Sequence, residues 1–134
     1  MRGWVFVTLA VYATVFAAVG VRNHLHDLVA SGPDAYLYAP HPFREFFVAL
    51  AVIDAVIVVL IVLRRPVAPI LAAAVVAVDL TGNWISDWQY YHDNLGWLAA
   101  NKGGLIQLTA FAVFVFATAI PLRRALQRRA AQRR

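Results

Sequence analysis

Two acidic residues lie inside stretches that are otherwise almost purely hydrocarbon. Asp54 is embedded in AVIDAVIVVLIVL, and Asp79 in ILAAAVVAVDLTGNW. An Asp at the centre of a membrane helix costs about 2.5–3.5 kcal/mol on insertion scales, so such groups are shielded by partners, perform a task, or do both. A carboxyl group surrounded by hydrocarbon favours its neutral form and suits a general acid, whereas a better supported carboxylate suits a base. We therefore expect Asp54 to be an acid and Asp79 a base.

The residues that follow Asp79 form a polar ladder on one helical face. At about 100° per residue, Asn83, Asp87 and Tyr90 fall on the same side as Asp79. Trp84 and Trp88 fall on the opposite side, as expected of aromatic anchors that face lipid. This ladder predicts that the helix presents acids, an amide and a hydroxyl to the interior of the protein.

A second polar stripe follows the first apolar stretch if its helix continues to about residue 30. Tyr12, Asn23 and His26 share one face of that helix, whereas His24 points elsewhere. His26 is therefore the histidine that we expect to join the two aspartates as a catalytic residue. Arg22 flanks the stripe and is the natural counter-ion for Asp79 or Asp87, because buried charges in membranes pair.

The remaining spans complete the expected pocket. Gln107 is the polar residue of the last span, and Phe47, Phe111 and Phe114 supply apolar walls of the kind that surround small-molecule ligands. We expect a pocket with Asp54 deepest, in which the ligand-binding side chains are Tyr12, Arg22, Asn23, Asn83, Asp87, Tyr90 and Gln107.

The composition indicates the elements that must position these groups. Of the 134 residues, 62% are hydrophobic and only 14% are charged, which is too few to cover a water-soluble surface. Four apolar stretches of about 18 residues occur at 4–21, 46–63, 67–84 and 105–122, each close to the length that crosses a bilayer as a helix. The first follows Arg2, as in a signal peptide, but exceeds the 7–15 apolar residues of that class. We predict an all-α fold, a single transmembrane domain built as an antiparallel four-helix bundle.

The net charge of +5 is distributed unevenly along the chain. Nine of the twelve basic residues lie on one side of the four-span arrangement, in the N-terminus, the 64–66 link and the 123–134 tail. The positive-inside rule places both termini on the cytoplasmic side of a cell membrane, so the pocket is expected to open toward the outer side. We expect the tail to continue the fourth helix and to contact anionic lipid headgroups rather than nucleic acid.

The residue types also exclude several chemistries. The sequence has no cysteine, which excludes thiol redox enzymes of the vitamin K epoxide reductase type and thiolate metal sites. His24, His26 and His92 with their neighbouring aspartates supply zinc-type ligands, but no two of the histidines stand four residues apart on a helix. We therefore expect neither a metal nor a cofactor.

The preferred function is binding or acid–base conversion of a lipophilic small molecule, by isomerisation, cyclisation or hydrolysis. An alternative is proton-coupled transport of a small solute by a homo-oligomer, for which an acid in mid-membrane is a standard element. Small multidrug transporters are of similar length with four helices, but their functional acid lies in the first span, which has none here. A further alternative is an accessory subunit whose polar stripes contact helices of another protein.

Overall fold

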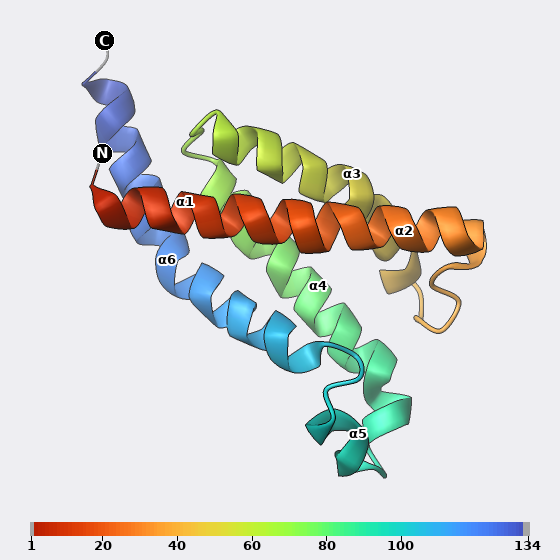
Figure 1. Cartoon of the computed structure of the whole chain (residues 1–134). Coiled ribbons are helices and arrows are strands. Elements are labelled where there is room, and N and C mark those ends of the chain that lie inside the picture. The colour runs from red at the N-terminus through yellow and green to blue at the C-terminus, as the bar shows by residue number, and fades with distance from the viewer. Residues whose placement is uncertain (1, 133–134) are drawn as a thin grey trace.

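A computed structural model describes residues 2–132 (Figure 1). The arginines of the predicted tail at positions 133 and 134 lie outside the described residues. No strand occurs within the described part, which confirms the all-α prediction. The elements in chain order are α1 (Gly3–Val15), the π-helix η1 (Phe16–Val21), α2 (Arg22–Ser31), the 3-10 helix η2 (Gly32–Asp34), α3 (Phe43–Val62), α4 (Ala68–Tyr91), the short α5 (Leu95–Ala99) and α6 (Leu105–Ala131).

Four helical segments of residues 2–132 are long and apolar enough to cross a membrane, as the sequence predicts. They are Gly3–Asp34, Phe43–Val62, Ala68–Tyr91 and Leu105–Ala131. The first is a composite of α1, η1, α2 and η2 that continues well beyond its apolar stretch. The last continues through the basic tail to Ala131, as expected. The protein is therefore an antiparallel four-helix membrane bundle with extended helix ends.

Proline and glycine mark the ends of these helices. The α2 helix ends at Ser31, and Gly32 follows it with a φ of 57°. Pro42 precedes the first residue of α3, and Pro69 lies in the first turn of α4, where the missing amide hydrogen costs no helical bond. Gly104 precedes α6 with a φ of 68°, a conformation that glycine adopts without steric cost.

The helices form two pairs that cross in Figure 1. α4 and α6 pack along each other, and α3 packs against α1, η1 and α2. The N-terminus, the link between α3 and α4 and the C-terminal half of α6 gather at one end, which we call the arginine end (Figure 1). The core between the pairs is apolar and aromatic, and its largest fully buried side chains include Tyr12, Phe47, Leu50, Ile57, Val115 and Leu122.

The π-helix η1 changes the register of everything that follows it in the first segment. Each π turn closes an i→i+5 hydrogen bond and so holds one residue more than an α turn. Over the six residues of η1 the extra length comes to about one residue, or about 100° of rotation relative to an uninterrupted α-helix. Positions 24 and 27 therefore take the directions that an unbroken α-helix assigns to 23 and 26.

Candidate functional site

A cavity of about 300 Å³ lies between the two helix pairs, toward the end of the bundle opposite the arginine end. We call it the central cavity. Its apolar walls come from η1, α3, α4 and α6 and include Phe16, Phe47, Val75, Val76 and Phe111. Its polar lining consists of Asn23, His24, Asp27, Tyr36, Tyr38, Asp54, Asp79 and Asn83. This combination of apolar walls with a few convergent polar groups is typical of small-molecule sites.

Asp54 is the most deeply buried acid of the cavity, with 4% of its surface exposed. It projects from α3 toward the π-helix, where Gly20 leaves room for its carboxyl group. A β-carbon at position 20 would lie 2.9 Å from Asp54 Cγ, closer than such atoms approach in proteins. The absence of a side chain at Gly20 is thus what allows the carboxyl group to lie at the wall of the cavity.

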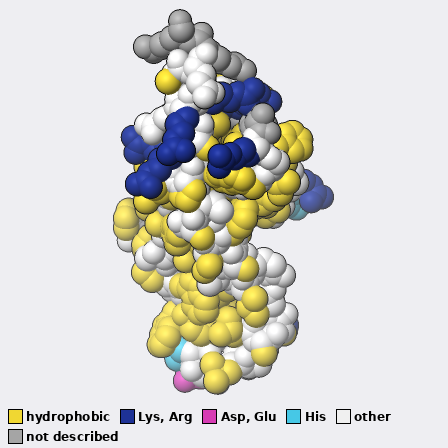
Figure 2. All heavy atoms as spheres, turned by 90° about the vertical axis from the view of Figure 1, so that its left-hand side faces the viewer, with side chains coloured by type: hydrophobic (Ala, Val, Ile, Leu, Met, Phe, Trp, Pro, Cys, Tyr) yellow, Lys and Arg dark blue, Asp and Glu magenta, His cyan; other side chains and the backbone are white. Residues whose placement is uncertain are grey.

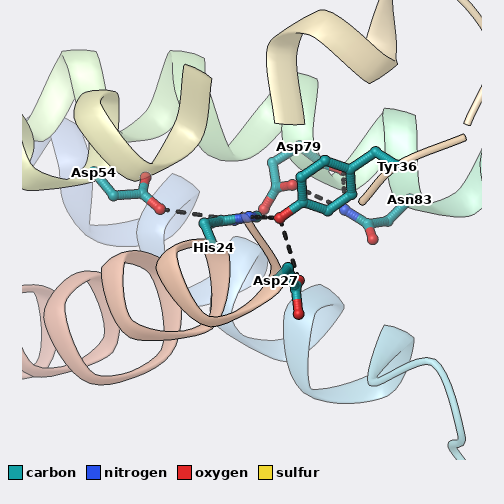
Figure 3. Close-up of polar contacts among 6 residues, drawn as sticks. All are labelled: His24, Asp27, Tyr36, Asp54, Asp79 and Asn83. Atoms are coloured by element: carbon teal, nitrogen blue, oxygen red, sulfur yellow. Dashed lines mark hydrogen bonds and ion pairs between the residues drawn. The ribbon is translucent and has the colours of Figure 1, made fainter. Parts of the chain in front are cut away.

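His24 connects Asp54 to a line of polar groups (Figure 3). Its Nε2 atom lies 3.9 Å from Asp54 Oδ2, and its Nδ1 atom lies 2.8 Å from the hydroxyl oxygen of Tyr36. The Tyr36 hydroxyl donates a hydrogen bond of 3.2 Å to Asp27 Oδ2. Because a hydroxyl has a single proton, Tyr36 must accept from an Nδ1–H of His24. In a neutral imidazole Nε2 is then unprotonated, and it is the nitrogen that faces Asp54.

Asp79 is held by its own helix. The side-chain amide of Asn83 donates to Asp79 Oδ1 at 2.8 Å and to the backbone carbonyl of Asp79 at 2.9 Å (Figure 3). This i, i+4 contact is the lower part of the ladder predicted from the sequence. Asp79 is half-buried and lines the same cavity as Asp54, so the structure brings the two predicted acids together.

The segment 35–42 between η2 and α3 contributes two tyrosines to the cavity. Tyr36 is buried and packs edge-on against Phe47, with ring centroids 5.6 Å apart. Burial, reinforced by Asp27, raises the pKa of Tyr36 above its ordinary value, so its hydroxyl remains a proton donor. Burial and the neighbouring carboxylates, Asp87 foremost, raise the pKa of Tyr38 to about 12.

The orientations predicted for His26 and Arg22 are wrong. Both are exposed and line a separate shallow groove on α2, together with Leu25 and Val29. Arg22 forms no ion pair with an acid among the described residues, so it is not the counter-ion expected for Asp79 or Asp87. The cause is the π-helix, which rotates α2 by about one residue and turns His24 inward in place of its neighbour.

Four other predicted ligand-binding residues lie outside the central cavity. Tyr12 is fully buried and bonds α6 through Val115 O at 3.0 Å and Thr118 Oγ1 at 2.9 Å. Gln107 is exposed and bonded to Asn101, and Tyr90 is exposed and stacked on Trp97. Asp87 is buried beside Gly103, where a β-carbon would lie 2.6 Å from Asp87 Oδ2.

Two aromatic predictions also change. Trp84 does not face lipid: its indole Nε1–H donates to Thr109 Oγ1 of α6 at 3.1 Å, and its ring packs edge-on against Tyr91. Trp88 is exposed, as predicted. Of the three expected phenylalanines, Phe47 and Phe111 line the cavity, whereas Phe114 packs against Tyr12.

The line formed by His24, Tyr36 and Asp27 was not predicted from the sequence. No simple pattern marks Tyr36, because it lies in an irregular segment whose path depends on tertiary packing. His24 and Asp27 share an α-helical face at i, i+3 spacing, but only the π-helix turns that face toward Asp54.

The charges of the cavity are unbalanced. Asp27, Asp54 and Asp79 line it, and no Lys or Arg does so within residues 2–132. No group of three or more metal-ligating side chains with a metal-like arrangement occurs in the same part of the chain. What the arrangement can do is therefore bind a polar head that donates hydrogen bonds, and hold or move a proton.

Comparisons with protein-family models, with curated proteins and with solved structures found no match to this chain.

Proposed function

We propose that the central cavity binds a lipophilic small molecule and performs acid–base chemistry on it. The single observation that carries this proposal is Asp54, buried in a membrane-spanning helix, at the cavity wall and 3.9 Å from His24. An ionisable group inside a membrane bundle is a functional site by default, because its burial is costly and hydrogen bonds between membrane helices average only about 0.6 kcal/mol.

The polar line gives His24 the character of a base. With its Nδ1–H bonded to Tyr36, the neutral imidazole presents a free lone pair on Nε2. Asp27, on the far side of Tyr36, stabilises the proton at Nδ1 and would stabilise an imidazolium. The gap of 3.9 Å to Asp54 is too long for a hydrogen bond, so the acid and the base are close without already being bonded to each other.

The lining indicates what kind of ligand fits. Aromatic and aliphatic walls suit a hydrocarbon body. Three carboxyl groups, with no Lys or Arg beside them among the described lining residues, favour a polar end that donates hydrogen bonds or carries positive charge, such as an amine or an alcohol. We therefore propose a lipophilic amine or alcohol as the ligand.

Proton-coupled transport is the second candidate. It is favoured by the position of Asp54 near the middle of α3, because proton-coupled transporters typically carry a proton-binding acid in the middle of a membrane span. The two candidates differ in one experiment. Proton flux coupled to a solute in liposomes supports transport, whereas conversion of the co-purified molecule in detergent, without compartments, supports an enzyme. The inward positions of Asp54 and Asp79 argue against an accessory subunit, which would present them on its surface.

Native mass spectrometry of the protein purified in a mild detergent tests the proposal. The wild type should retain a lipophilic molecule, and Asp54→Asn should reduce its occupancy about tenfold or more, because the ligand loses its hydrogen bond to the carboxyl group. Asp34→Asn is the matched control, since Asp34 is exposed and does not line the cavity. Equal occupancy in all three proteins, or no bound molecule in any, would contradict the proposal.

A further inference from the structure

A second cavity, of about 720 Å³, lies at the arginine end of the bundle. It is a groove between the start of α1 and the C-terminal part of α6, and we call it the arginine groove. Arg2 lines it from the first side, and Arg124 and Arg128, one helical turn apart, line it from the second, together with Arg129. Figure 2 faces this end and shows the arginine side chains gathered around it, with apolar surface beside them.

No acidic side chain lies near Arg2, Arg124 and Arg128 in the sequence. No Asp or Glu occurs among residues 1–26 or 94–134. Among the described residues, Arg2, Arg124 and Arg128 form no ion pair with an acidic side chain. The α1 helix begins beside Arg2 without a side-chain cap and without an acidic residue in its first turn, so its helix dipole adds to the positive potential. The arginine groove is thus suited to an anion.

The floor of the groove is apolar. Val5, Pro121 and Leu126 line it together with the arginines. Trp4, also in the lining, is 41% exposed at the start of the first membrane span, where indole rings prefer the headgroup level. The apolar stretches of α1 and α6 end at this groove, so its lining changes from apolar side chains to arginines along its length.

We propose that the arginine groove is a binding site for one anionic phospholipid, whose phosphate is bound by Arg2, Arg124 and Arg128 and whose acyl chains lie on the apolar floor. Guanidinium groups bind phosphate oxygens in pairs of parallel hydrogen bonds, which gives geometry as well as charge. Basic pockets at the cytoplasmic side of membrane helices bind phosphate headgroups in this way. The site is independent of the central cavity and of the function proposed for it.

The test is a titration in detergent, in which native mass spectrometry counts bound lipid. Phosphatidylglycerol should bind with one preferred site, and Arg124→Gln should weaken this binding about fivefold, the loss expected for one arginine near a charged headgroup. Arg123→Gln is a closely matched control, since Arg123 is also exposed on the same helix but does not line the groove. It should change the affinity less than about twofold, because free salt screens distant charges. Arg124→Lys, which retains the charge but not the paired bonds, should be intermediate.

Two further titrants identify the source of the phosphate. Phosphatidylcholine, which has the same phosphate but no net charge, should bind more weakly than phosphatidylglycerol. Glycerol phosphate, which lacks acyl chains, should not bind measurably at the same concentration. Equal losses in Arg123→Gln and Arg124→Gln would overturn the groove in favour of diffuse attraction by the tail. Binding of glycerol phosphate as tight as that of the lipid would overturn the lipid as ligand.

Discussion

The imidazole of His24 in α2 faces the carboxyl group of Asp54 in α3 across 3.9 Å. The contact joins two spans that are separated by the whole 35–42 segment, and it lies at the wall of the central cavity. It depends on two features of η1: its extra residue turns His24 inward, and Gly20 leaves room for Asp54. The π-helix is therefore the element that assembles the site, in keeping with the frequent occurrence of such turns at functional positions.

Replacing His24 and His26 in turn tests whether His24, as in the structure, or His26, as predicted from an uninterrupted α-helix, faces the central cavity. His24→Asn should reduce ligand occupancy about tenfold, because it removes the base and the hydrogen bond between His24 and Tyr36. His26→Asn, two residues away and in a separate groove, should leave occupancy unchanged. Ligand occupancy is measured by native mass spectrometry. Loss in His26→Asn alone would mean that α2 has the uninterrupted α-helical register.

Gly20→Ala should destabilise the protein, although alanine is normally the better helix former. The added methyl group would overlap the carboxyl group of Asp54, and overpacking of this kind costs about 1–3 kcal/mol. Gly3→Ala is the control, since no atom lies within 4 Å of its added carbon. The midpoint of thermal unfolding in detergent should fall for Gly20→Ala and stay the same or rise for Gly3→Ala. A rise in both variants would show that Asp54 does not pack against Gly20.

Tyr36→Phe should lower the free energy of unfolding by about 1–3 kcal/mol, because His24 and Asp27 lose the hydroxyl between them. Tyr38→Phe is the comparison, since Tyr38 lines the same cavity but its hydroxyl forms no hydrogen bond with the described residues. It should cost less than Tyr36→Phe in thermal unfolding at neutral pH. Equal costs would show that the hydroxyl of Tyr36 is not the link between His24 and Asp27.

Tyr36 should also make the stability of the protein depend on pH. The pKa of Tyr36 is raised by burial and by Asp27 above the ordinary 10.0, so the folded protein holds this proton more tightly than the unfolded chain does. This contribution to stability is present in full below about pH 10 and is lost as the pH rises through the higher folded-state pKa. The decline in unfolding midpoint between about pH 10 and 11 should therefore be shallower in Tyr36→Phe than in the wild type. Identical slopes would contradict this contribution.

The membrane orientation is tested by cysteine labelling, which is clean because the chain has no cysteine of its own. The positive-inside rule predicts that Asp34→Cys and Asn94→Cys react with an impermeant maleimide added to intact cells. Gln127→Cys, at the arginine end, should react only after the cells are permeabilised. The reverse pattern would place the central cavity on the cytoplasmic side.

The four helices and their lipid surroundings follow from the amino-acid sequence alone. Uninterrupted apolar stretches of membrane length can satisfy every backbone amide in lipid only as helices, and Pro33 has no amide hydrogen with which to continue the α-helix that ends at Ser31. The contact between Asp79 and Asn83 also follows from the sequence, because two residues four apart on one helix meet whatever surrounds them.

The rest of the site depends on contacts between elements that are far apart in the sequence. No local sequence pattern predicts the π-helix. It orients His24, and not His26, toward the central cavity, and it leaves Arg22 outside the interior. Packing between helices placed Asp54 against Gly20, and the irregular segment 35–42 brought Tyr36 to Asp27. Sequence spacing predicts which residues share a face only within an uninterrupted helix. One extra residue in a turn rotates everything that follows by about 100°. Whether that residue is accommodated depends on the neighbouring helices.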